Sequence, residues 1–257
     1  MAEAGRDEDM LEDEFDQLAG WTARAIRDLE LEDPVPAACN GSGSPASLAW
    51  LRDRLGLGSD SSVLDTGAGL GGPAAWMARS SGARLFTAEP MARAAGGSRA
   101  LFATPGVVAW SHQLPFASGG FSAALALAVL STVGDKEAYL REVRRVLTPG
   151  GGLGLLDYVR TGAPVAAPPA NNDFLLPGQL DDLLGASGFR VRARAMASDL
   201  APIPAEWSAV SERVSRSVAA AHPGARAVER SEAQQQRFAR LLSDGSLGIR
   251  LVAAVRA

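Results

Sequence analysis

The chain has 257 residues, of which 47% are hydrophobic and 21% are charged, and its 28 glycines and 15 prolines are distributed along its length. These values fit one globular domain with an appendage and exclude a wholly disordered chain. A single cysteine, Cys39, excludes an intrachain disulfide and a multi-cysteine zinc site.

Charge is concentrated near the N-terminus, where residues 1–35 hold 12 of the 29 acidic and 3 of the 25 basic groups. The arginines elsewhere form no block of the kind that nucleic-acid binding proteins carry. The sequence shows no signal peptide and no apolar run long enough to span a membrane. We therefore expect a cytoplasmic protein, a monomer or homodimer, with neither nucleic acid nor membrane as a partner.

Residues 1–45 are predicted to form an acidic arm and a helical cap. Apolar side chains recur at helical spacing over residues 15–31. Pro34 and Pro36 are expected to end this helix. A loop follows, and a second helix is expected over residues 45–55.

From residue 62 onward, strand and helix patterns alternate. Strands are expected at residues 62–65, 84–88, 107–110, 122–130 and 153–159, and helices at residues 73–80 and 136–147. The stretch 122–130 is apolar without alternation, as in a strand covered on both faces. This rhythm predicts an α/β fold with a largely parallel sheet and helices on both faces.

The last third of the chain has a different rhythm. The expected elements are a loop at 161–172, a helix at 177–187, a strand at 188–193, helices at 204–220 and 225–243, and a strand at 246–256. Both late helices lie between the last two strands. We therefore expect one α/β domain over residues 46–257, with a two-helix insertion at about 200–245 that covers a ligand pocket.

The strongest chemical signal is the segment Val63–Gly72, which reads VLDTGAGLGG. Glycines at a strand-to-helix turn let the backbone bend sharply, and free N–H groups at a helix start suit a negative group. Gly67, Gly69 and Gly72 also satisfy the G-x-G-x-x-G pattern, so a dinucleotide fold has to be weighed. Asp65, two residues before the first glycine, would repel a pyrophosphate but suits a cationic amino-acid moiety.

The second signal is Glu89, which ends the second expected strand. An acidic side chain about 20 residues beyond such glycines can accept both hydroxyls of a ribose. The alternative is an exposed loop carboxylate without a ligand.

Three ordered segments resemble the class I S-adenosylmethionine-dependent methyltransferases, in the branch with small-molecule acceptors. Residues 62–78 resemble the family's glycine-rich motif I, residues 113–121 (QLPFASGGF) the stretch before its fourth strand, and residues 140–151 (LREVRRVLTPGG) the helix and turn before its fifth. The likeness extends to about residue 195. It implies a Rossmann-like seven-stranded sheet, mostly parallel, with an antiparallel last strand inserted between the fifth and sixth. It also implies methyl transfer from S-adenosylmethionine, which leaves S-adenosylhomocysteine.

The resemblance also implies a set of cofactor contacts. Asp65 would support the amino group of the cofactor, and Glu89 would hold its ribose hydroxyls. The remaining expected contacts run along the methionine and ribose (Gly67, Ala68, Gly69), around the adenine (Pro90, Met91, Ser111, His112, Gln113) and under the sulfonium (Ala128).

The chain departs from the family pattern at two aspartate positions and at the end of the fourth strand. Trp110 stands where the family usually has the aspartate that binds the adenine amino group, and Ser122 stands at the second position. Residues 130–132 hold no side chain that titrates near neutral pH. These departures motivate an alternative, a catalytically degenerate methyltransferase-fold protein that binds a partner chain.

Candidates for catalysis are few. Methyl transfer from a sulfonium is a substitution on an activated carbon, so alignment supplies much of the rate and a base is needed only when the acceptor must lose a proton. Weak candidates for that base are Asp157 and Tyr158, near the end of the fifth strand, and His112. The sequence has no metal-ligand cluster, so we expect no metal.

The cap and insertion suggest what the acceptor is. Trp21 and Trp207 are candidate aromatic lids over the pocket, although plain packing explains them as well. Apolar residues of the late helix, such as Ile203 and Val210, point to a hydrophobic small molecule.

Overall fold

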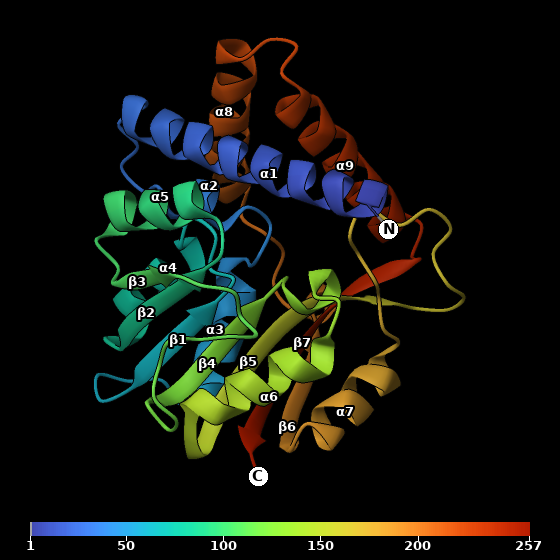
Figure 1. The fold of residues 1–257 in the computed structure, drawn as a ribbon. Coiled ribbons are helices and arrows are strands. Elements are labelled where there is room, and N and C mark those ends of the chain that lie inside the picture. The colour runs from blue at the N-terminus through green and yellow to red at the C-terminus, as the bar shows by residue number, and fades with distance from the viewer. Residues whose placement is uncertain (1) are drawn as a thin grey trace.

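A seven-stranded sheet with the order β3-β2-β1-β4-β5-β7-β6 runs through the molecule (Figure 1). The computed structural model describes the backbone of residues 2–257 and the side chains of residues 12–257. The strands are β1 Ser62–Thr66, β2 Arg84–Glu89, β3 Gly106–Val108, β4 Phe121–Leu127, β5 Leu147–Arg160, β6 Phe189–Met196 and β7 Leu247–Arg256. β7 runs antiparallel to both β5 and β6, and the other pairs are parallel. The expected Rossmann-like sheet, with its antiparallel last strand inserted between the fifth and sixth, is confirmed.

Helices cover both faces of this sheet. They are α1 Ala2–Asp28, α2 Val35–Cys39, α3 Pro45–Leu55, α4 Gly72–Ser81, α5 Ala92–Phe102, α6 Lys136–Val146, α7 Pro177–Ala186, α8 Ala205–Ala221 and α9 Arg226–Ser243. Side chains of α6 and α7, among them Leu140 and Leu184, pack with one face of the central strands. Leu51 of α3 and Met77 of α4 pack with the other. The buried apolar faces of these helices therefore hold the sheet between two layers.

Three helices, α1, α8 and α9, lie over one end of the strands and are called the roof below (Figure 1). Its apolar side chains form a cluster of their own, in which Ile26 of α1 packs with Val214 and Val218 of α8 and with Val228 of α9. The chain enters the roof after β6 and leaves it into β7, as expected of a late two-helix insertion. Helices from distant parts of the sequence thus pack into one layer over the strand ends.

The N-terminal region differs from the prediction in two helices. The first helix ends at Asp28, before the prolines, where Glu30 adopts a positive φ of +45°. Pro36 does not end that helix but lies in the first turn of α2. The N–H groups of a helix's first turn have no partner within the helix, so a proline costs no hydrogen bond there. Sequence patterns also missed α5, which contains two adjacent glycines. No helix within residues 2–257 combines the length and apolarity needed to cross a membrane.

Candidate functional site

The glycine-rich turn joins β1 to α4 at the end of the strand, on the side of the sheet that the roof covers. Gly67, Gly69 and Gly71 have φ angles of +71°, +54° and +76°, which residues with a Cβ rarely adopt. A Cβ at Gly67 would lie 2.6 Å from Cγ2 of Val129, which follows β4. The turn therefore requires glycine at Gly67 both for its backbone conformation and for the approach of the next strand's end.

Glu89 ties this turn to the end of β2. Its side chain is 5% exposed, and Oε2 accepts a hydrogen bond of 2.7 Å from the backbone N–H of Gly69. Oε1 accepts one of 3.0 Å from the N–H of Met91. Burial raises the pKa of Glu89, and the two backbone hydrogen bonds oppose that shift. A carboxylate has about four lone-pair sites, so this group can still accept hydrogen bonds from a ligand.

Asp65 is a buried carboxyl with an unused oxygen. The residue is 1% exposed, and Oδ2 has no hydrogen-bond partner among the described residues. Burial, with the nearby charge of Glu89, raises the pKa of Asp65 to about 8. Because an unpaired polar group is costly to bury, this carboxyl is suited to a cationic partner.

Thr66 and Tyr139 form a polar contact that the sequence did not reveal. The Thr66 hydroxyl donates to the Leu125 carbonyl over 2.9 Å and lies 2.6 Å from the Tyr139 hydroxyl. No motif in the sequence marks Tyr139 as a hydrogen-bond partner. The contact fixes the last residue of β1 to both β4 and α6, directly before the glycine turn.

The loop after β3 lies beside the end of β2. Val108 pairs with Glu89, and the N–H of Ala109 donates to the Glu89 carbonyl over 3.1 Å. The strand ends at Val108, so Trp110 lies in the loop, 50% exposed. Ser111 is buried, whereas His112 and Gln113 are exposed. The loop that holds Ser111, His112 and Gln113 thus begins beside Glu89.

The end of β4 differs from the expected strand over 122–130. The strand ends at Leu127, and Ala128 adopts a left-handed φ of +59° while its N–H donates to the Leu156 carbonyl over 2.7 Å. A non-glycine residue in this conformation is uncommon and is held by its surroundings. A short 3-10 turn, η1 Leu130–Thr132, follows. Ala128 and Gly67 therefore each follow the end of one of two paired parallel strands, β4 and β1.

Asp157 is directed at this same turn. It is 3% exposed, and its carboxylate accepts hydrogen bonds from the backbone N–H groups of Ser131, over 3.0 Å, and of Tyr158, over 2.7 Å. Burial raises its pKa, and these hydrogen bonds oppose the shift. Two backbone groups thus fix the orientation of the carboxylate.

Tyr158 lies in an aromatic cluster between the sheet and the roof. Its ring centroid is 4.6 Å from that of Phe238 on α9 and 6.4 Å from that of Phe174. Burial and the charge of Asp157 raise the pKa of the Tyr158 hydroxyl to about 12. At neutral pH this hydroxyl is therefore protonated and can donate a hydrogen bond.

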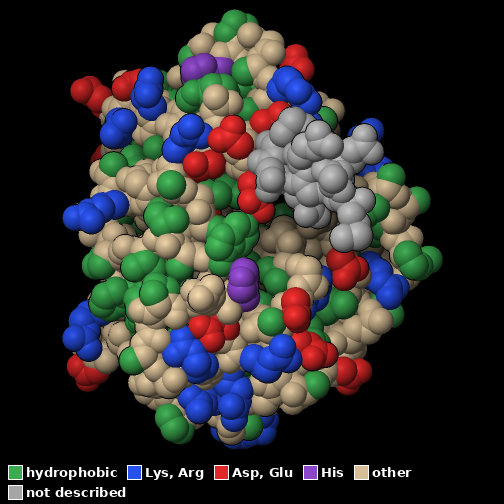
Figure 2. Space-filling view, viewed as in Figure 1, with side chains coloured by type: hydrophobic (Ala, Val, Ile, Leu, Met, Phe, Trp, Pro, Cys, Tyr) green, Lys and Arg blue, Asp and Glu red, His purple; other side chains and the backbone are tan. Residues whose placement is uncertain are grey.

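The two tryptophans considered as candidate lids pack in different layers of the molecule. Trp21 of α1 stacks on His222, at the end of α8, with ring centroids 3.7 Å apart, and Trp207 packs with the apolar layer that contains α3 and α4. The two histidines of the chain occupy separate places on one face of the molecule (Figure 2), so they share no site. Trp21 therefore packs α1 against the end of α8.

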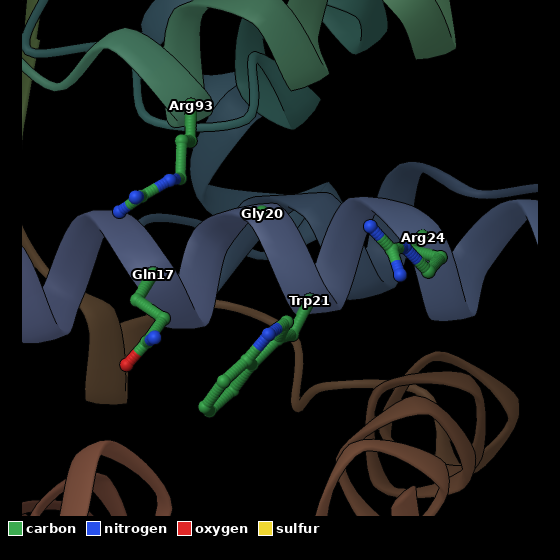
Figure 3. A pocket seen from close by; sticks show the side chains of 5 residues that line it. All are labelled: Gln17, Gly20, Trp21, Arg24 and Arg93. Atoms are coloured by element: carbon green, nitrogen blue, oxygen red, sulfur yellow. The ribbon is translucent and has the colours of Figure 1, made fainter. Parts of the chain in front are cut away.

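A surface pocket of about 310 Å³ adjoins α1 and α5. Figure 3 shows the residues that line it, Gln17, Gly20, Trp21, Arg24 and Arg93, with Arg93 on the opposite side of α1 from Trp21. None of them belongs to the glycine turn. Across residues 12–257, no group of three or more His, Cys, Asp or Glu side chains is placed to hold a metal ion.

Comparisons with known proteins agree with this geometry. The methyltransferase domain model of the Methyltransf_11 family matches residues 64–155, which run from β1 to β5. The methyltransferase GfsG of Streptomyces halstedii is 33% identical over 119 residues, which cover 44% of this chain and 43% of that relative. An uncharacterized protein of Mycobacterium tuberculosis, Rv2003c, is 37% identical over 94 residues, covering 32% of this chain and 33% of its own. The matched region thus spans less than half of these curated relatives.

Solved structures share the fold over most of the chain. The [4+2]-cyclase SpnF superposes with a TM-score of 0.64 and 22% identity, covering 81% of this chain and 80% of its own. The geranyl diphosphate C-methyltransferase of Streptomyces coelicolor A3(2), solved with S-adenosyl-L-homocysteine, superposes with a TM-score of 0.59 and 17% identity, covering 82% of this chain and 76% of its own. Motif, strand order and domain match therefore agree: residues 64–155 match a methyltransferase domain, and the chain has the Rossmann-like methyltransferase fold.

Proposed function

We propose that this protein transfers a methyl group from S-adenosylmethionine to a small-molecule acceptor and releases S-adenosylhomocysteine. The observation that carries the proposal is the contact between Glu89 and Gly69, which brings an acidic side chain at the end of β2 against the glycine turn after β1. This arrangement suits a nucleoside whose ribose hydroxyls donate to the carboxylate. It also agrees with the match of residues 64–155 to a methyltransferase domain.

The residues at the turn fit the cofactor in charge and shape. The unpartnered Oδ2 of Asp65 suits the α-ammonium group, and the left-handed glycines leave room for the methionine chain beside the backbone. The remaining lone pairs of Glu89 suit the ribose diol. When bound, the cofactor supplies a methyl group on a sulfonium, and this chain's residues hold and align it.

We assign Asp157 to positioning, not to proton transfer. Its carboxylate accepts the backbone N–H of Ser131, in the turn that follows Ala128. It therefore holds the backbone that would lie under the sulfonium. Because alignment supplies much of the rate in this chemistry, a group that fixes this turn contributes without touching the acceptor.

Tyr158 is the better candidate for direct contact with an acceptor. Its raised pKa favours the protonated hydroxyl, which donates a hydrogen bond and does not accept a proton. The surrounding rings of Phe174 and Phe238 suit an apolar molecule. We infer an acceptor with a hydrophobic body and a polar group near the methylated atom. The helical cap of residues 1–45 and the insertion at about 200–245 would cover this acceptor on the α/β domain of residues 46–257.

Isothermal titration calorimetry with S-adenosylmethionine and S-adenosylhomocysteine tests the proposal. We expect binding by the full chain, and an affinity at least about tenfold weaker for Glu89→Ala, because a hydrogen bond to a charged group contributes about 1.5–3 kcal/mol. Glu137→Ala, which removes an exposed carboxylate on α6, is the matched control and should bind as the wild type does. No binding at millimolar cofactor would reject the enzyme and favour the non-catalytic alternative.

A transfer assay addresses the acceptor. The protein is incubated with S-adenosylmethionine carrying an isotopically labelled methyl group and with apolar compounds that bear a hydroxyl, amino, thiol or nucleophilic carbon. Label in one product class identifies the methylated atom. Cofactor binding without transfer to any such compound would support a binding protein of the same fold.

A further inference from the structure

Trp110 is an exposed indole at the edge of the proposed cofactor site. Within residues 12–257, the large apolar side chains that are exposed are Val108 at 59%, Trp110 at 50% and Ile203 at 56%. An indole presents a large apolar face and an N–H, so beside a proposed binding site it suits contact with a ligand. Trp110 therefore calls for an explanation that packing does not supply.

The register of the sheet places Trp110 beside the groups proposed to hold the ribose. Val108 pairs with Glu89, and both strands run in the same direction, so Trp110 lies two residues beyond that pair just as Met91 does. The N–H of Met91 donates to the Glu89 carboxylate. A base attached to a ribose at Glu89 would thus lie at the level of both Met91 and Trp110.

The loop presents an aromatic face but no free carboxylate. Residues 108–113 contain neither Asp nor Glu. Glu142, which bonds to this loop through the N–H of Leu114 at 2.8 Å, is also paired with Arg145 at 2.8 Å. A hydrogen bond of 2.9 Å from the Gln113 N–H to the Trp110 carbonyl closes the loop. The His112 ring lies 6.1 Å from the indole and extends the aromatic surface.

We propose that Trp110 binds the cofactor's base by stacking and that no carboxylate reads the exocyclic amino group of the adenine. Stacking on an aromatic side chain tolerates different bases, since each base has a π face. The protein therefore accepts a cofactor in which the 6-amino group is replaced by an oxygen. The inference rests on the proposed function, because it takes the ribose to lie at Glu89.

Titrations with two product analogues test this inference. Wild type is expected to bind S-inosylhomocysteine within about threefold of S-adenosylhomocysteine. Trp110→Ala should weaken both by roughly fivefold or more, the loss expected for one stacked ring. Trp110→Phe should restore most of the affinity. Trp110→Asp should favour the adenosyl compound by at least tenfold, because its carboxylate accepts from the amino group and repels the 6-oxo group.

Val108→Ala is the matched control, since it removes an exposed apolar side chain two residues away without touching the base. It should bind both compounds as the wild type does. Unchanged affinity of Trp110→Ala, or rejection of S-inosylhomocysteine by the wild type, overturns the inference while the proposed function stands. A change in oligomeric state for Trp110→Ala with unchanged affinity would assign the indole to a protein interface. Failure of the wild type to bind S-adenosylhomocysteine overturns both proposals.

Discussion

Asp16 of α1 caps the N-terminus of α5 by accepting a hydrogen bond of 2.7 Å from the backbone N–H of Arg93. The same oxygen accepts from the N–H of Ala94 at 3.1 Å, whereas Met91, the N-cap residue of α5, has no side chain able to do so. A side chain from the roof thus satisfies donors that a helix start leaves open. The roof is thereby fixed next to Met91 and Glu89.

Asp16→Ala should lower the free energy of unfolding by about 1 kcal/mol, the usual cost of losing a helix cap. Urea denaturation measures this change, and hydrogen exchange should rise in α1 and at the start of α5. Asp13→Ala is the control, because Asp13 forms only an exposed ion pair with Arg93, at 3.3 Å. Equal losses for the two variants would contradict the capping role.

Gly67→Ala should destabilise the fold by at least about 2 kcal/mol. The left-handed conformation disfavours a Cβ, and the new methyl group would meet Val129 at 2.6 Å. Thermal unfolding measures the loss. Gly96→Ala in α5, where a Cβ meets nothing within 4 Å, should instead stabilise by about 0.5–1 kcal/mol.

The double variant Gly67→Ala/Val129→Ala separates the two causes. It should recover the part of the loss that comes from the clash and leave the part that comes from backbone conformation. No recovery would mean that the close approach of Val129 does not contribute.

Local patterns predicted the sheet well because its strands carry strong signals of their own. Apolar runs bounded by glycine turns mark β1 and β4, and the motifs that flank them set the strand order through the family resemblance. The candidate site was predicted from the same residues, since Asp65 is the last but one residue of β1 and Glu89 ends the adjacent β2. These features depend on residues close together in sequence.

What the patterns missed depends on tertiary contacts. α5 contains Gly96 and Gly97, which lower its helix propensity, yet a Cβ at Gly97 would meet Leu70 and Ala23 of α1. The helix therefore forms where close packing needs glycine. The stack of Trp21 on His222 likewise joins distant segments, so neither residue carries a local signal.

Asp157→Ala should destabilise the protein by about 1–3 kcal/mol, because the buried N–H of Ser131 loses its acceptor. Affinity for S-adenosylhomocysteine should fall as well, since the turn after Ala128 is released. Asp157→Asn keeps one of the two acceptor oxygens and places an NH2 donor at the other, so it should lose only part of the stability and of the affinity. Chemical denaturation and calorimetry measure the two effects.

Turnover distinguishes this positioning role from general-base catalysis. If Asp157 were a general base, Asp157→Ala and Asp157→Asn would lose transfer equally. If it positions the turn, the amide of Asp157→Asn partly replaces it. An Asn variant that binds the cofactor normally but has lost all transfer would show that the carboxylate acts on the acceptor.

Binding of the cofactor should release a proton from Asp65. With a pKa near 8, this carboxyl is mostly protonated in the free protein at pH 7. An ammonium partner favours the ionised form, so affinity should increase as pH rises from 6 to 8, by at most about tenfold per pH unit. Calorimetry in buffers of different ionisation enthalpy measures the proton released.

Asp65→Asn supplies the control, because it keeps the shape of the side chain without the titration. It should bind S-adenosylhomocysteine more weakly and release less proton, with a flatter dependence on pH.

The unliganded wild type should lose stability as pH rises. A raised folded-state pKa contributes stability that is fully present below the unfolded value, near 4, and is lost as pH rises toward 8. Equal proton release by the wild type and Asp65→Asn would mean that Asp65 does not meet the ammonium group, because other groups, such as the buried carboxyls Glu89 and Asp157, would then account for all of it.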